Sequence, residues 1–136
     1  MKHLGVDYGD VRTGLAVSDL TGFLASGIGY ISEGGMRHTA VRVAKEARER
    51  EVASIVVGYP KNMDGSEGPR TEVVRAFVEL LRAETDIPVL LWDERLSTVE
   101  AHRFLTMTGS GGKKRKKLVD TLSAQIILQD YLDAHR

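Results

Sequence analysis

The sequence contains no cysteine. This absence excludes disulfide bonds, thiolate metal sites, iron–sulfur clusters and a cysteine nucleophile. The sequence also has no excess of charge of either sign, because 19 Lys and Arg balance 19 Asp and Glu. A protein that coats nucleic acid through bulk positive charge is therefore excluded, and any such binding has to use a local basic patch.

Long hydrophobic runs are absent as well. No apolar stretch approaches the roughly 20 residues that span a bilayer, and Asp7 interrupts the N-terminal segment before the apolar region of a signal peptide could form. We therefore expect a protein located in the cytoplasm, with no membrane partner. The 136 residues, of which 28% are charged, suit one globular domain over residues 1–136.

The hydrophobic pattern predicts an α/β fold. Two short strands at residues 4–7 and 15–18 are joined by a glycine-containing turn, which is typical of an antiparallel hairpin, and a third strand is expected within residues 25–32. Continuous apolar runs at 54–57 and 88–92 are typical of strands buried on both faces. Helices are expected from residue 36, from residue 69, from a capping box at 97–100, and from about 118 to 134. This order predicts a mixed sheet with helices on its faces, and the last helix should be buried on much of its circumference.

Four acidic residues follow predicted strands or begin a predicted helix. Asp7 ends the first strand, Asp93 and Glu94 follow the last strand, and Asp120 begins the last helix. If the first and last strands are parallel neighbours, these carboxylates converge at one edge of the sheet. Clustered carboxylates repel each other unless they hold cations, and an all-oxygen ligand set selects Mg²⁺ or Mn²⁺. Two such ions about 4 Å apart can activate water and stabilise the leaving oxygen of a phosphodiester.

Each acid also has a purely structural interpretation. Asp7 could serve the glycine-rich turn that follows it. One of Asp93 and Glu94 should point away from the site, since alternate strand residues face opposite ways. Asp120 near a helix start would be favoured by the helix dipole alone.

Basic residues accompany these acids. Residues 113–117 are five consecutive cations, which indicates a polyanionic partner more than a solvated loop. The connection over residues 58–68 is longer than usual between a strand and a helix, and it carries Lys61 and Asn62. We therefore interpret it as a substrate-contacting loop.

Several segments together resemble one protein family. Residues 5–9 (GVDYG), 56–65 (VVGYPKNMDG), 93–98 (DERLST) and 119–120 (VD) resemble the YqgF/RuvX family, in order and over nearly the whole chain. Members are nucleases similar to Holliday junction resolvases and are assigned to maturation of the 5′ end of pre-16S rRNA. The resemblance implies an RNase H-like fold with a mixed five-stranded sheet. It also implies an acidic catalytic and metal-binding site at Asp7, Glu94 and Asp120, with Asp93 a less certain neighbour.

We therefore expect a Mg²⁺- or Mn²⁺-dependent endonuclease acting on structured RNA such as pre-rRNA, alone or on ribosomal particles, as a monomer or a homodimer. The residues expected to bind the substrate backbone are Arg12, Lys61, Asn62, Arg95, Lys113, Lys114, Arg115, Lys116 and Lys117. Three alternatives stay open. The first is a Holliday junction resolvase acting on branched DNA. The second is a non-catalytic RNA-binding factor, and the third is a nucleotide-phosphate binder, for which the chain is short.

Overall fold

The computed structural model describes residues 1–32, 34–62, 64–93 and 112–135, and for residues 112–120 it describes the course of the helix. The strands are β1 (His3–Asp7), β2 (Thr13–Ser18), β3 (Ala25–Ile31), β4 (Ser54–Tyr59) and β5 (Val89–Asp93), and the helices are α1 (Gly35–Glu49), α2 (Pro69–Glu84) and α4 (Gly112–Ala134). The helix expected from the capping box at 97–100 lies outside the described residues.

The five strands form one mixed sheet in the order β3-β2-β1-β4-β5. The pairs β1–β2 and β2–β3 are antiparallel, whereas β1–β4 and β4–β5 are parallel. The predicted mixed five-stranded sheet is confirmed, but β1 and β5 are not neighbours, because β4 lies between them. The carboxyl ends of β1, β4 and β5 still meet at one edge of the sheet.

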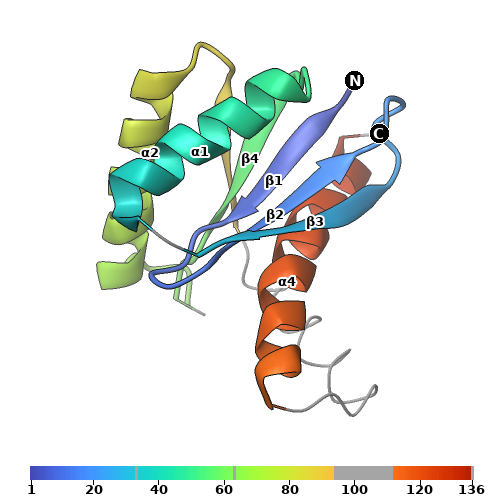
Figure 1. The fold of residues 1–136 in the computed structure, drawn as a ribbon. Helices are drawn as coiled ribbons and strands as arrows, with labels where there is room; N and C mark the ends of the chain where they lie inside the picture. Colours follow the sequence, from blue (N-terminus) through green and yellow to red (C-terminus); the bar gives the residue numbers. More distant parts are fainter. Residues whose placement is uncertain (33, 63, 94–111, 136) are drawn as a thin grey trace.

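Helices cover both faces of the sheet, as Figure 1 shows. The larger core joins Leu4, Val6, Ile55 and Val57 to the apolar stripes of α1 and α2. The smaller core joins Ala16 and Val56 to α4. The two faces are therefore distinct, and each strand residue can be assigned to the α1/α2 face or to the α4 face from the core in which its neighbours pack.

Helix α4 packs very close to the sheet because two glycines lie beneath it. A Cβ atom at Gly5 would lie 2.7 Å from Leu128 Cβ and 3.0 Å from the Ala124 carbonyl oxygen, and one at Gly27 would overlap the methyl group of Thr121. None of residues 121–132 is exposed. For residues 121–132, the expected burial of this helix on much of its circumference is confirmed.

Three predicted boundaries are wrong by two residues or more. Strand β2 begins at Thr13 rather than at residue 15. Strand β4 continues through Gly58 and Tyr59, which pair with Trp92 and Asp93 of β5, so the connection to α2 is shorter than expected. Helix α4 begins at Gly112 rather than near residue 118. The basic run 113–117 is thus helical, and Asp120 lies inside the helix rather than at its start. No helix in the described ranges is both long enough and apolar enough to cross a membrane.

Candidate active site

Asp7 is the last residue of β1 and lies on the α4 face of the sheet. Its neighbours Leu4 and Val6 pack into the α1/α2 core, whereas Gly5 lies under Leu128 of α4. Residues two apart on a strand share a face. The Asp7 side chain is half-buried and therefore emerges beside α4, at the carboxyl edge of the sheet.

Position 120 lies on the stretch of α4 that approaches Asp7. The rings of His3 and Tyr131 are 5.6 Å apart, and Gly5 contacts Ala124 and Leu128, so α4 runs antiparallel to β1. The next helical turn toward the start of α4 contains residue 120, four positions before Ala124. The fold thus brings position 120 toward the carboxyl end of β1; the Asp120 side chain itself lies outside the described part.

Asp93 lies on the opposite face from Asp7. Val89 of β5 packs into the α1/α2 core, and Leu91 and Asp93 follow it at two-residue intervals. Trp92 packs with Tyr131 against α4. Asp93 is therefore separated by the sheet from the acids expected around Asp7. Glu94 and Arg95, which the sequence also places in the site, lie outside the described residues.

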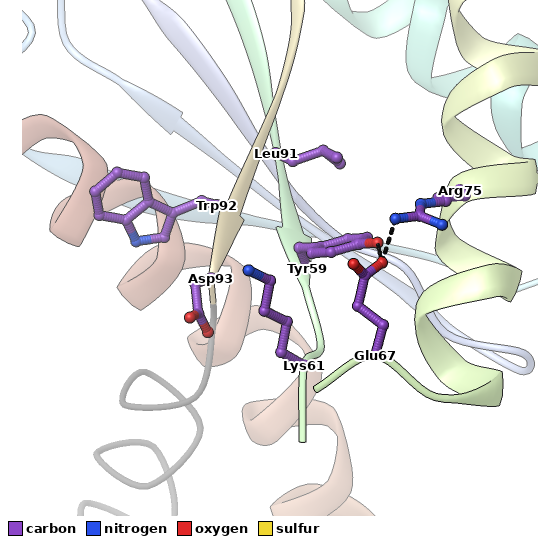
Figure 2. Close-up of a pocket in the computed structure, with 7 residues that line it drawn as sticks. All are labelled: Tyr59, Lys61, Glu67, Arg75, Leu91, Trp92 and Asp93. Atoms are coloured by element: carbon purple, nitrogen blue, oxygen red, sulfur yellow. Dashed lines mark hydrogen bonds and ion pairs between the residues drawn. The ribbon is translucent and has the colours of Figure 1, made fainter. Parts of the chain in front are cut away.

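The α2 side of β4 and β5 carries a cavity of about 480 Å³. Figure 2 shows Tyr59, Glu67 and Arg75 together at one end, and Lys61 and Asp93 at the other. The Tyr59 hydroxyl and the Arg75 guanidinium both donate hydrogen bonds to Glu67 Oε1. The hydrogen bond from Tyr59 is the main cause that lowers the pKa of Glu67, while burial, followed by that hydrogen bond, raises the pKa of Tyr59. Lys61 thus lines a cavity on the face opposite Asp7.

Asn62 stabilises the turn that follows β4. Its backbone N–H donates to the Ser66 carbonyl oxygen (2.9 Å), its carbonyl accepts the Gly65 N–H (2.8 Å), and its side-chain amide donates to Ser66 Oγ (3.1 Å). These bonds give Asn62 a role in holding the loop. Its contact with substrate, expected from the sequence, stays a prediction.

The turn after Asp7 is held by a residue that sequence reasoning missed. Arg70, in the first turn of α2, donates to the Tyr8 carbonyl oxygen (2.6 Å) and to Asp10 Oδ1 (3.0 Å). The Tyr8 ring in turn stacks on Phe77, with centroids 4.4 Å apart. No local pattern could have revealed the contact between Arg70 and Asp10, because the two residues are 60 positions apart.

Arg12, a predicted substrate contact, lies in the same turn. Its guanidinium is placed over the ring of Tyr30, 5.4 Å from the centroid. The basic residues at 113–117 belong to the first turns of α4, and their side chains are outside the described part. Within the described residues, no group of three or more His, Asp or Glu could hold a metal ion.

Comparisons with known proteins point to one family. The sequence profile of the family described as "RuvX: Holliday junction resolvase" matches residues 1–134. A protein of Geobacillus sp. (strain WCH70), named "Putative pre-16S rRNA nuclease", is 46% identical over 136 residues, covering 98% of this chain and 99% of its own. A protein of Clostridioides difficile (strain 630) with the same name is 48% identical over 130 residues, covering 96% and 92%.

Solved structures share the fold at low sequence identity. The Thermus thermophilus RuvC in complex with a Holliday junction substrate has a TM-score of 0.60 at 15% identity, covering 98% of this chain and 94% of its own. The fowlpox virus Holliday junction resolvase also has a TM-score of 0.60, at 14% identity with full coverage of both chains. The predicted RNase H-like fold is thereby confirmed, and the chain belongs to the RuvX family.

Proposed function

We propose that the protein is a nuclease that hydrolyses a phosphodiester bond in structured RNA. The Geobacillus and Clostridioides relatives, which share 46% and 48% of its residues, are named "Putative pre-16S rRNA nuclease". The observation that carries the proposal is the position of Asp7. Its carboxylate emerges at the carboxyl edge of the sheet, on the face where α4 brings position 120 toward it. Ligand sites of open α/β sheets occupy this edge. We place the reaction in the cytoplasm, on pre-rRNA that is free or part of a ribosomal particle.

The donor chemistry at this edge fits a hard divalent cation. Asp7 offers a half-buried carboxylate, and the chain contains no sulfur ligand of the cysteine type. Asp7, Glu94 and Asp120 would hold Mg²⁺ or Mn²⁺, for which oxygen ligands are preferred. Such an ion lowers the pKa of water and stabilises negative charge that develops on phosphate oxygens.

The chain's own basic residues would position the substrate. The five cations at 113–117 lie in the first turns of α4, directly before the helical turn that contains Asp120. A phosphate backbone bound there would run toward Asp7. Arg12 adds a cation over Tyr30, which pairs with Gly14 in the same row of the sheet as Asp7.

The proposal is tested by comparing two isosteric variants. Asp7→Asn removes a charge from the proposed site, whereas the matched control Asp93→Asn removes one from the opposite face. We expect Asp7→Asn to slow Mn²⁺-dependent cleavage of a pre-16S rRNA fragment by more than about 100-fold. Loss of a residue that only hydrogen-bonds to a metal ligand costs roughly 10- to 100-fold. Asp93→Asn should cleave at nearly the wild-type rate. A folded Asp7→Asn variant with undiminished activity would refute the assignment.

The basic start of α4 has its own test. Neutralising Lys114 and Arg115 together should flatten the slope of log K against log[salt] for RNA binding by about 1.4 to 1.8, if each cation contacts one phosphate. An unchanged slope would show that these residues do not contact the backbone.

The second candidate is a Holliday junction resolvase, which the description of the matching family names. The same carboxylates would serve both reactions, since both break phosphodiesters. Cleavage of a four-way DNA junction and of an rRNA precursor, measured side by side with the Asp7→Asn variant as the blank, separates the two candidates.

A further inference from the structure

The strand pairing that holds β1 ends at Asp7. Strand β1 pairs with β2 as far as Asp7, but with β4 only as far as Val6. The next two residues, Tyr8 and Gly9, belong to no strand. The contacts of Tyr8 and Gly9 therefore decide how firmly the chain is held on the carboxyl side of Asp7.

Helix α2 holds the Tyr8 ring through two residues on one of its faces. The ring stacks on Phe77, with centroids 4.4 Å apart, and the Arg70 guanidinium lies 5.6 Å from the centroid of the same ring. Val6 and Tyr8 both belong to the α1/α2 core, so the alternation of β1 continues through Tyr8. A Tyr8 side chain held against α2 thus turns the preceding residue, Asp7, toward α4.

Arg70 also holds the backbone of Tyr8. Its Nη2 donates a hydrogen bond to the Tyr8 carbonyl oxygen (2.6 Å), and its Nη1 donates to Asp10 Oδ1 (3.0 Å). A hydrogen bond from a charged donor is roughly twice as strong as one between neutral groups. The Asp10 side chain is 76% exposed, so its ion pair with Arg70 contributes little. The bond to the carbonyl, which is partly buried, is therefore the contact through which Arg70 acts on the chain beside Asp7.

We propose that Arg70 is a positioning residue of the nuclease site, which holds the end of β1 through the Tyr8 carbonyl so that the Asp7 carboxylate faces α4. Arg70 comes from α2, on the face of the sheet opposite the Asp7 side chain, so it acts through the backbone. The inference rests on the proposed nuclease function and deepens it, because it names a residue that controls the geometry of the same site.

Arg82 provides a matched control on the same helix. Its Nη2 donates to the Val89 carbonyl oxygen (2.8 Å), and its Nη1 pairs with Glu79 (3.5 Å). Val89 is the first residue of β5, at the amino edge of the parallel strands, whereas Asp7 lies at their carboxyl edge. Arg82→Ala therefore removes the same two kinds of contact as Arg70→Ala, but far from Asp7.

The test measures metal-dependent cleavage of a pre-16S rRNA fragment at a temperature where circular dichroism shows every variant folded. Arg70→Ala should lower kcat by about 10- to 100-fold and leave KM within about twofold, because a displacement of about 1 Å in a reacting group costs up to about 100-fold. Arg82→Ala should keep both values. Asp10→Asn, which leaves the bond to the Tyr8 carbonyl in place, should keep them as well. Arg70→Lys keeps the charge but not the planar fork, so its kcat should fall between those of Arg70→Ala and the wild type.

A second measurement reads the position of Asp7 without metal or substrate. The amide resonance of Asp7 in a ¹H–¹⁵N NMR spectrum of the full-length protein should shift in Arg70→Ala and stay unchanged in Arg82→Ala. If Arg70→Ala does not fold, Arg70→Lys and Arg82→Lys serve for the same comparison in both measurements.

Four results would overturn the inference. These are a wild-type kcat in Arg70→Ala, an equal loss in Arg82→Ala, an equal loss in Asp10→Asn, or an Asp7 amide that does not move in Arg70→Ala. Failure of the proposed function is a separate result, which would appear as undiminished cleavage by Asp7→Asn. The NMR comparison does not depend on cleavage, so it still shows whether Arg70 holds Asp7.

Discussion

The distance between α4 and the sheet should control both stability and activity, and Gly5 is where it can be perturbed. An added methyl group in Gly5→Ala would lie 2.7 Å from Leu128 Cβ and 3.0 Å from the Ala124 carbonyl oxygen. Neither atom is at the end of a flexible side chain, so the whole helix has to move. Overpacking of this kind costs about 1–3 kcal/mol, against which the stiffer unfolded chain returns about 0.5–1 kcal/mol. From the middle of both ranges, the expected net loss is about 1 kcal/mol, which lowers the melting temperature by about 4 °C.

Gly27→Ala provides the matched comparison, because its clash can be relieved. The new methyl group would overlap only the Cγ2 methyl of Thr121, while the next atoms, Gln125 Oε1 and Thr121 Cβ, lie at 3.6 and 3.7 Å. Thr121→Ser removes that methyl and keeps the hydroxyl. The double variant Gly27→Ala/Thr121→Ser should therefore melt at or above the temperature of Thr121→Ser alone, whereas Gly27→Ala alone should melt below the wild type.

The assay is thermal unfolding followed by circular dichroism, together with metal-dependent cleavage at a temperature where every variant is folded. Gly5→Ala should lose activity even when folded, because α4 carries position 120 away from Asp7. The double variant at Gly27 should keep it. Wild-type melting of Gly5→Ala, or a failure of Thr121→Ser to rescue Gly27→Ala, would refute the close packing of α4.

Three further predictions concern other parts of the fold. Burial, then the positive N-terminus and His135, lower the pKa of His3, so the unfolded state binds a proton more readily than the folded state. The contribution of His3 to stability should be full above about pH 6.5 and be lost as the pH falls through the lower pKa of the folded state. His3→Asn should therefore reduce the dependence of the melting temperature on pH. Glu67→Gln should lower the pKa of Tyr59, seen by ¹³C NMR titration of the tyrosine ring, because a charged acceptor of its hydroxyl is lost. Phe77→Ala should cost about 3–5 kcal/mol in urea unfolding, since this ring is fully buried.

Local pattern was sufficient for most elements but not for their ends. The apolar run at 54–57 predicted β4, yet the strand continues because the Tyr59 side chain is buried and its backbone pairs with Asp93. The sequence pattern predicts the start of the last helix near residue 118, after the basic run. Lysine and arginine are good helix formers, however, and the helix that packs on the sheet from residue 121 onward continues back through them to Gly112.

The candidate acids were easier to name from the sequence than to place on one face of the sheet. Asp7 and position 120 approach each other because α4 packs against β1. The sequence already indicated that the two would meet at the end of a strand. Which of Asp93 and Glu94 could join them depends on the face that each presents. That face follows from Val89 packing against α1 and α2, a tertiary contact that fixes Asp93 on the far side of the sheet. Strand alternation alone left the choice open.

The orientation of Tyr30 shows how the core can decide which face of a sheet a side chain takes. Ile28 and Ile31 are three residues apart, so a regular strand would direct them to opposite faces. Both nevertheless pack into the α1/α2 core, Ile31 as a fully integrated member and Ile28 at its margin. The strand register shifts between Leu15 and Ala16, so Ile28 is an extra residue in β3, and Gly29 permits this bulge with a φ of 115°. Tyr30 then pairs with Gly14 on the α4 face. Burial of both isoleucines thus places Tyr30 on the same face of the sheet as Asp7. The sequence of β3 holds this information only in combination with the core that receives it.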